Sequence, residues 1–408
     1  ERQRDAVELD YFKQYVFHTQ WNRLHAYART KGIEILGDMP IFIAQDSADV
    51  WAHQQLFDLN EDGSPHTVAR VAGVPPDYFS ATGQLWGNPQ YNWTAMAEEH
   101  YAWWKRRFRK LREQVDIIRI DHFRGFESYW SVDGKADTAL NGTWLKGPGK
   151  AFFDEVEREL GPLNIVAEDL GIITPDVERL RDDCGFPGMK IVQFLIAGNS
   201  SGRIGFTAPE NSIVYTGTHD NNTTVGWYDR DIDEVLRESL ANLVGTTSDR
   251  PRTICWRLIK AAYASRARMA IIPMQDIMGL DERARMNTPG TVGLNWRWSL
   301  KKDYLLEIDP KKIQALCVRY RRRTYKLCQI VRNQNESHVL FDTERLLLQY
   351  GWRNLRTALG MLRQTLICAM SRYRTWGYSC ASIISLTRNI RINSAIRQRE
   401  RTSSSAWT

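Results

Sequence analysis

The sequence predicts an α/β fold, a (β/α)8 TIM barrel with inserted subdomains, and two observations favour it. Six short β-rich apolar runs alternate with helical patterns, which indicates a parallel sheet covered on its faces. Four of these runs contain or end in an acidic residue, namely Asp38, Asp121, Glu168 and Asp220. Carboxylates at the carboxyl ends of barrel strands converge on one pocket, so their recurrence predicts a site at that end of the barrel.

The elements follow in a regular order. The chain opens on a long amphipathic helix, where Leu9, Phe12 and Val16 recur at intervals of three and four. The expected strands come next, at residues 33–43, 117–121, 164–168, 189–195, 212–219 and 269–275. Asp276, directly after the last run, resembles the other acidic strand ends. A doubly wound open sheet is the structural competitor, but no GxGxxG motif opens a helix.

Composition narrows the function classes. The 408 residues carry a net charge of +7, yet residues 301–408 hold 21 Lys and Arg against 7 Asp and Glu, so the first 300 residues are acidic. Most of the 15 tryptophans also precede residue 300, which suits a neutral, hydroxyl-rich ligand better than a nucleic acid. Six cysteines without a CxxC pair predict free thiols and no metal site. No apolar run approaches the roughly 20 residues that cross a bilayer.

The acidic strand ends fit glycosyl transfer, which needs one carboxylate and one protonated carboxylic acid around the anomeric carbon. Asp121, Glu168 and Asp220 could supply these two groups and one further carboxylate. Arg119, two residues before Asp121, faces the same side of its strand and would keep a neighbouring carboxylate ionised. Partial burial would raise the pKa of Glu168 toward that of a general acid. His122 and His219 are neutral donors for sugar hydroxyls.

Plainer interpretations of the same residues stay open. A lone Asp at a strand end commonly caps the following helix, and Arg119 with Asp121 could be a structural ion pair. Considered without its neighbour Asp220, His219 is typical of a histidine buried in the core. Cys184 reads as an ordinary thiol, because no neighbouring His activates it.

Six motifs together resemble the amylomaltase, or 4-α-glucanotransferase, family (glycoside hydrolase family 77). They occur in the family's order within about residues 10–325 and read GDMPIFIAQDSADVW, VAGVPPDYFSATGQLWGNPQYNW, IIRIDHFRGFESYW, IVAEDLGIITPDVERLR, VYTGTHDNNTTVGWY and ARMNTPGT. The resemblance implies a retaining double displacement on α-1,4-glucans, which transfers a glucan segment to the 4-hydroxyl of glucose or another α-glucan. It implies no cofactor and no metal.

The resemblance also implies residue roles. Asp121 matches the nucleophile, Glu168 the acid/base and Asp220 the third carboxylate that stabilises the transition state. The residues that match sugar-binding positions are Arg119, His122, His219, Asp77, Tyr78, Gln84, Trp86, Asn88 and Asn287. Asn222 replaces an Asp that is usual in the family.

The resemblance sets the expected domain organisation. Residues 1–326 are expected to form a partial catalytic barrel that holds strands three to eight, with a substrate-loop insertion at about residues 44–100. We therefore expect a fragment of a longer protein. Residues 327–408, which hold 12 Arg and no Lys, are expected to be a tail without a fold of its own.

Rival functions remain: an α-glucan hydrolase, a catalytically impaired glucan-binding fragment, and nucleic-acid binding through the tail. The expected partners are malto-oligosaccharides and α-1,4-glucans, with no nucleic acid and no membrane. The expected location is the cytoplasm, or a plastid if a transit peptide preceded this sequence.

Overall fold

A computed structural model describes residues 4–59, 70–76, 80–197, 207–291, 293–301 and 304–322. The chain divides into two compact units, Glu1–Ala26 with Tyr350–Thr408, and Tyr27–Gln349. The expected N-terminal helix is confirmed as α1 (Arg4–Thr30), on which Phe17 and Trp21 stack with ring centroids 6.0 Å apart. The predicted tail at residues 327–408 lies outside the described residues. The fold and the site below belong to the second unit.

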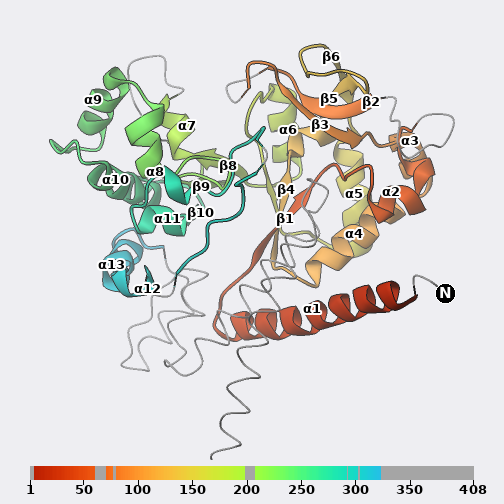
Figure 1. Cartoon of the computed structure of the whole chain (residues 1–408), viewed down its shortest axis with the longest axis horizontal. Helices are drawn as coiled ribbons and strands as arrows, with labels where there is room; N and C mark the ends of the chain where they lie inside the picture. The colour runs from red at the N-terminus through yellow and green to blue at the C-terminus, as the bar shows by residue number, and fades with distance from the viewer. Residues whose placement is uncertain are drawn as a thin grey trace, which may run out of the picture. The chain divides into compact units, whose positions relative to one another are not determined.

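A curled, fully parallel six-stranded sheet forms the centre of this unit, as predicted (Figure 1). Each strand pairs with the next in chain order, so β1 and β10 form the two edges. The strands are β1 (Leu36–Pro40), β4 (Ile117–Asp121), β7 (Ile165–Ala167), β8 (Gly188–Ile191), β9 (Ser212–Tyr215) and β10 (Met269–Ile271). All of them except β4, which matches residues 117–121, are shorter than predicted. After β8 the apolar run turns helical at Val192, and after β10 it does so at Met274.

Helices follow most strands and cover the sheet. Asp233 and Asp309 accept a hydrogen bond from the first turn of the helix that follows them, and α6, α10 and α13 start with proline, which has no N–H to satisfy there. The helices after α1 are α2 (Ala48–Ala52), α3 (Trp93–Glu98), α4 (Ala102–Arg112), α5 (Gly149–Leu160), α6 (Pro175–Asp183), α7 (Val192–Ala197), α8 (Thr224–Gly226), α9 (Glu234–Leu243), α10 (Pro251–Ala264), α11 (Met274–Ile277), α12 (Tyr304–Glu307) and α13 (Pro310–Arg319). The 3-10 helices are η1 (Gln54–Leu56), η2 (Phe123–Phe126) and η4 (Glu282–Ala284), and η3 (Trp227–Asp231) is a π-helix.

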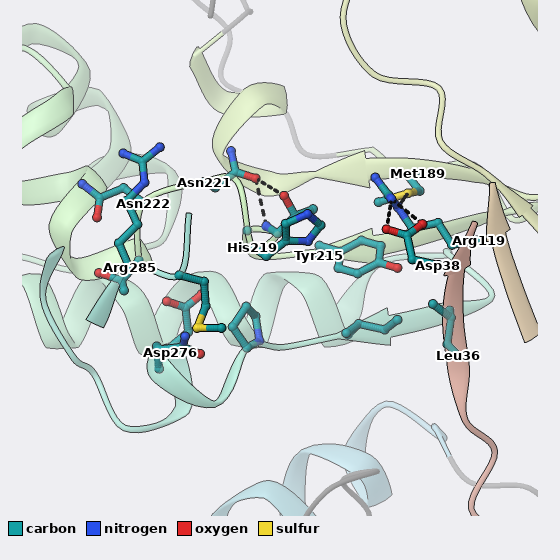
Figure 2. A pocket seen from close by; sticks show the side chains of 17 residues that line it. Leu36, Asp38, Arg119, Met189, Tyr215, His219, Asn221, Asn222, Asp276 and Arg285 are labelled. Carbon is teal, nitrogen blue, oxygen red and sulfur yellow. Dashed lines mark hydrogen bonds and ion pairs between the residues drawn. The ribbon is translucent and has the colours of Figure 1, made fainter. Parts of the chain in front are cut away.

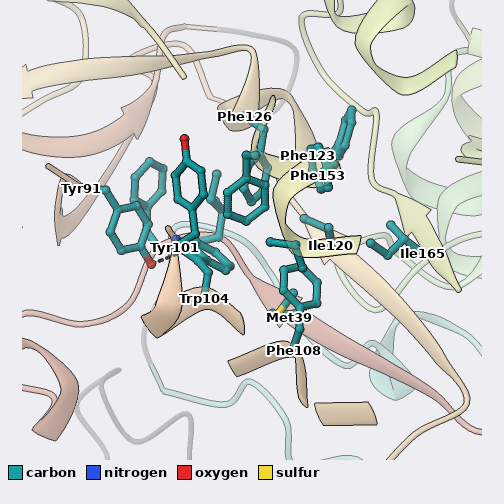
Figure 3. Close-up of a cluster of buried hydrophobic side chains, with 14 of the residues drawn as sticks. Met39, Tyr91, Tyr101, Trp104, Phe108, Ile120, Phe123, Phe126, Phe153 and Ile165 are labelled. Atoms are coloured by element: carbon teal, nitrogen blue, oxygen red, sulfur yellow. Dashed lines mark hydrogen bonds between the residues drawn. The ribbon is translucent and has the colours of Figure 1, made fainter. Parts of the chain in front are cut away.

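Side chains alternate along β4, so one face of the strand packs into the core and the other face bears the site residues. On β4, Ile118 and Ile120 pack into an aromatic-rich cluster with α4 and α5, while Ile117 joins a second apolar cluster on the opposite face. Figure 3 shows this aromatic cluster, which includes Trp104 and Phe126. Each fully buried ring contributes about 1.5–3 kcal/mol, so the cluster holds β4 firmly in place. Arg119 and Asp121 share the face of Ile117 because side chains alternate along a strand.

A second, antiparallel sheet was not predicted. It has four strands in the order β3-β2-β5-β6. Their bounds are β2 (Arg70–Val74), β3 (Gln84–Pro89), β5 (Ser128–Asp133) and β6 (Gly142–Lys146). The first two lie within the expected insertion, and the other two follow β4 in the chain. This sheet brings β3 to the segment that follows β4, where Trp86 contacts His122 at 4.8 Å between ring centroids.

Candidate active site

Arg119 lies at the centre of the candidate site. Strand register places it opposite Asp38 of β1, and its Nη1 donates to both carboxylate oxygens of Asp38 at 2.7 Å. The same nitrogen donates to Asp121 Oδ1 at 2.9 Å, and Nε contacts the sulfur of Met189 at 3.4 Å. The predicted pairing of Arg119 with Asp121 is therefore confirmed, and Asp38 is a second partner.

The charges around Arg119 fix its ionisation. Burial opposes the charged form, but the charges of Asp38, Asp121 and Glu168 outweigh it and raise the pKa of Arg119 well above its ordinary value. Burial raises the pKa of Asp38, with Arg119 opposing this shift and Asp121 adding to it. Arg119 is thus a permanent cation among carboxyl groups, and it favours ionised partners.

Glu168 has the character of an acid. It follows β7 directly, is buried, and accepts hydrogen bonds from the backbone N–H of His122 at 2.8 Å and of Leu170 at 2.9 Å. Burial is the largest influence and, with the charge of Asp121, raises the pKa of Glu168 to about 8 against the opposing effects of Arg119 and the two amides. The predicted upward shift is confirmed, so Glu168 holds a proton at neutral pH.

His122 turns the chain after β4. Its backbone lies in the left-handed region, with φ at 54°, which is uncommon outside glycine and frequent at functional sites. Burial lowers the pKa of His122 to about 4, so this ring is neutral, as predicted. Its Nε2 atom is buried without a hydrogen-bond partner among the described residues.

A second polar group surrounds Asp220. His219 Nε2 lies 3.2 Å from Asp220 Oδ2, and Asn287 Nδ2 donates to Asp220 Oδ1 at 2.6 Å. Burial alone would lower the pKa of His219, but Asp220 raises it above its ordinary value, so this ring gains a proton more readily than the predicted neutral donor. Burial opposes ionisation of Asp220, but His219 and Asn287 prevail and lower its pKa.

Arg285 donates hydrogen bonds to the backbone of two residues in this second group. Its Nη2 donates to the backbone oxygen of Asp220 at 2.8 Å, and its Nε donates to that of Asn287 at 2.8 Å. The backbone N–H of Asn287 also donates to His219 O at 3.1 Å. Three hydrogen bonds therefore join the strand-end segment of His219 and Asp220 to the late-chain segment of Arg285 and Asn287 when the Asn287–Asp220 side-chain bond is included.

A cavity of about 280 Å³ lies between the two edges of the parallel sheet (Figure 2). Leu36 of β1 and Ile271 of β10 both line it, because the sheet curls around it. Arg119 and Asp38 lie toward one end of the view, with His219 between them and Asn222. Its other lining residues are Met189, Tyr215, Gly217, Thr218, Asn221, Thr223, Pro273, Gln275, Asp276, Arg285 and Met286.

Gln84, Trp86 and Asn88 lie at alternate positions of β3, whose register against β2 shifts between Val71 and Gly73. Trp86 Nε1 donates to Gln84 Oε1 at 3.2 Å, and the ring of Trp86 meets the edge of His122. These contacts bring two of the three residues to the strand end that bears Asp121. The predicted Asp77 and Tyr78 lie outside the described residues.

Asp276 does not belong to the carboxylate site, which corrects its grouping with the acidic strand ends. It lies on α11, is buried, and accepts hydrogen bonds from Thr216 Oγ1 at 2.5 Å and from Thr224 N and Oγ1 at 2.7 Å. Its grouping failed because the chain has turned helical before this residue. Asp276 thus has a structural role.

The structure also shows the surroundings of Asn222, which lines the cavity, and of Cys184. Asn222 Nδ2 donates to Asp231 Oδ2 at 3.1 Å, and its backbone oxygen accepts from Gln193. Burial raises the pKa of the Cys184 thiol to about 12, which fits the ordinary thiol expected there.

Asp38 is a site residue that the sequence pattern marks only as an acidic strand end. Its position in an apolar run, in GDMP, is similar to that of Asp121 in RIDH. Its partnership with Arg119 depends on the register of β1 against β4, which no local pattern encodes.

Among the described residues, no group of three or more His, Cys, Asp or Glu side chains could hold a metal ion. No helix in the described part of the chain is long and apolar enough to traverse a bilayer.

The fold and site together define a class of protein. A curled parallel α/β sheet, with a protonated carboxyl group near an arginine-paired carboxylate at its strand ends, is the arrangement of barrel enzymes that act on glycosidic bonds. The model of the glycoside hydrolase 77 family, described as 4-alpha-glucanotransferase, matches residues 1–305, and the chain belongs to this family.

Known proteins agree with this assignment. The chain is 47% identical over 324 residues to a 4-alpha-glucanotransferase of Streptococcus pneumoniae, which covers 79% of this chain and 63% of that protein. It is 43% identical over 326 residues to a chloroplastic/amyloplastic 4-alpha-glucanotransferase of Arabidopsis thaliana, covering 79% of this chain and 56% of that one. The structure of an amylomaltase from Streptococcus agalactiae in complex with acarbose matches with a TM-score of 0.70 and 39% identity, over 76% of this chain and 62% of that chain. The chain thus spans less than two thirds of the length of these relatives.

Proposed function

We propose that this protein is a 4-α-glucanotransferase that moves a segment of an α-1,4-glucan from a donor to the 4-hydroxyl of glucose or another glucan. The observation that carries the proposal is the contrast between two carboxyl groups on adjacent strands. Asp121 is paired with Arg119, while burial raises the pKa of Glu168 to about 8. One group is thus suited to attack and the other to donate a proton. The family and its relatives support the same activity.

The proposed reaction has two displacements. First, an Asp121 carboxylate oxygen bonds to the anomeric carbon, the glycosidic bond breaks, and the proton of Glu168 passes to the departing glycosidic oxygen. Then the 4-hydroxyl of the acceptor bonds to the same carbon, its proton returns to Glu168, and the bond to Asp121 breaks. Configuration at the anomeric carbon is retained, and no other reactant is required.

The remaining residues bind the glucan in this proposal. Asp220, held by His219 and Asn287, accepts hydrogen bonds from hydroxyls of the reacting sugar and stabilises positive charge in the transition state. Arg119 pairs with Asp121, and neutral His122 donates to a hydroxyl. The segment at residues 73–93 positions the acceptor and limits the access of water. The residues assigned to it are Asp77, Tyr78, Gln84, Trp86 and Asn88.

The domain and location assignments belong to the same proposal. Residues 1–326 form the catalytic barrel portion, with the substrate insertion at about residues 44–100. The partners are malto-oligosaccharides and other α-1,4-glucans, without nucleic acid or membrane. The location is the cytoplasm, with a plastid as the alternative suggested by the name of the Arabidopsis relative.

Incubation of the chain with maltotriose tests the activity, with free glucose and longer oligosaccharides followed over time. We expect a ladder of longer glucans that disappears in Asp121→Asn and persists in Asp154→Asn, a matched change at an exposed aspartate of α5. Glucose release without longer products would indicate hydrolysis and contradict the proposal. No products from the unaltered chain would contradict the claim that this chain alone is an active enzyme.

A further inference from the structure

Trp296 is a partly exposed aromatic residue beside the candidate site that the proposed function does not use. Its ring lies against that of His219, with centroids 5.0 Å apart and an angle of 38° between the planes. Even so, 40% of the residue is exposed. One part of the indole therefore packs against the partner of Asp220, while another part stays open to solvent.

The backbone holds Trp296 in an unusual conformation. Its φ is 61°, in the left-handed region, which a bulky residue rarely adopts. Its backbone N–H donates to Met286 O at 2.6 Å, which holds this conformation. Trp296 keeps this rare conformation although 40% of the residue is exposed.

The preceding residue locks the segment. Asn295 Oδ1 accepts from the backbone N–H of Thr288 at 3.0 Å, and its Nδ2 donates to the backbone oxygen of Thr291 at 3.0 Å. This clamp closes the segment onto the residues directly after Asn287, whose side chain donates to Asp220 at 2.6 Å. The position of the indole is therefore tied to that of the carboxylate.

We propose that Trp296 is an aromatic platform for a hexose ring of the glucan, next to the ring held by Asp220. This inference rests on the proposed function and adds a specific contact to it. The C–H face of a pyranose packs on an indole face, while the hydroxyls at its rim stay in water, which matches a half-exposed ring at the border of a polar site. The competing role is purely structural, in which Trp296 only keeps His219 in place.

Calorimetric titration with maltoheptaose tests the platform without requiring turnover. We expect Trp296→Ala to weaken binding by about tenfold, because the variant loses the apolar face on which the sugar ring packs. Trp296→Phe should recover most of the affinity. Tyr11→Ala, at an aromatic residue of α1 that is 72% exposed, should bind like the unaltered chain.

Titration of the His219 ring by NMR in the free variants separates the two roles. The platform predicts that His219 in Trp296→Ala stays paired with Asp220, so that its pKa remains above that of an ordinary imidazole, while glucan affinity falls. Unchanged affinity in Trp296→Ala, or a loss accompanied by a His219 pKa below that of an ordinary imidazole, would overturn the platform and leave the proposed function intact. Failure of the unaltered chain to bind maltoheptaose would overturn both.

Discussion

At the scale of single residues, neighbouring carboxyl groups differ because their surroundings differ. Asp121 shares a hydrogen bond with the guanidinium of Arg119. Glu168 lies buried beside the charge of Asp121, and its hydrogen-bond donors among the described residues are two backbone amides. Ionising Glu168 would therefore place a second negative charge in a poorly hydrated place, which raises its pKa to about 8.

This environment predicts a pH-dependent effect of Glu168→Gln on stability. The pKa of Glu168 is raised in the folded state, so the folded protein keeps a proton that the unfolded chain loses above about pH 4.5. Its contribution to stability is complete below that pH and is lost as the pH rises toward 8. Glutamine stays neutral throughout, so its advantage over Glu168 should grow between pH 5 and pH 8 by on the order of 2–4 kcal/mol.

Urea unfolding of both proteins at the two pH values measures this change. Glu238→Gln, at an exposed glutamate of α9, provides the matched control and should show no such trend. A difference between Glu168→Gln and the unaltered chain that stays constant with pH would contradict the buried, protonated state.

At the scale of elements, the strand-end segments are held from both sides. The segment between β9 and α8 carries His219 and Asp220. Asp276 of α11 accepts from Thr216 at the start of this segment and from Thr224 at its end. One buried carboxyl group thus fixes both ends of a loop that bears a candidate catalytic residue.

Asp276→Ala should therefore weaken the whole region. It leaves the Thr216 hydroxyl and the Thr224 N–H and hydroxyl without their acceptor, which costs about 2–4 kcal/mol of the free energy of unfolding. We expect a lower urea midpoint together with a loss of glucan binding, because Asp220 is no longer held in place. Asp276→Asn, which retains an acceptor oxygen, should lose less of both. A midpoint equal to that of the unaltered chain would show that the segment is fixed by other contacts.

Element-scale patterns were also the part of the structure that the sequence predicted well. Alternation along residues 117–121 predicted that Arg119 and Asp121 share a face, and apolar residues before Glu168 predicted its burial. The four-stranded sheet escaped prediction because β2 pairs with β5 about 60 residues further along the chain, a distance at which local patterns carry no information. The left-handed backbone of Trp296 is likewise set by tertiary contacts rather than by a turn motif.

At the scale of the whole molecule, the curled sheet brings distant segments to one pocket. Asp38 and Asp276 lie on different elements far apart in the sequence, yet both line the cavity between β1 and β10 (Figure 2). Arg119 influences the pKa of Asp38, Glu168 and Asp220, which come from three different strand ends. We propose that this arrangement suits Asp121 to act as the nucleophile and Glu168 as its acid partner.

Covalent trapping tests that claim most directly. Glu168→Gln should be incubated with α-maltosyl fluoride, whose fluoride departs without a proton, and its peptides mapped by mass spectrometry. Attack by Asp121 forms the bond to the anomeric carbon as the carbon–fluorine bond breaks, and the missing base at position 168 slows release of the sugar. We expect a maltosyl ester on Asp121. An adduct on another residue, or none in a variant that binds the donor, would contradict it.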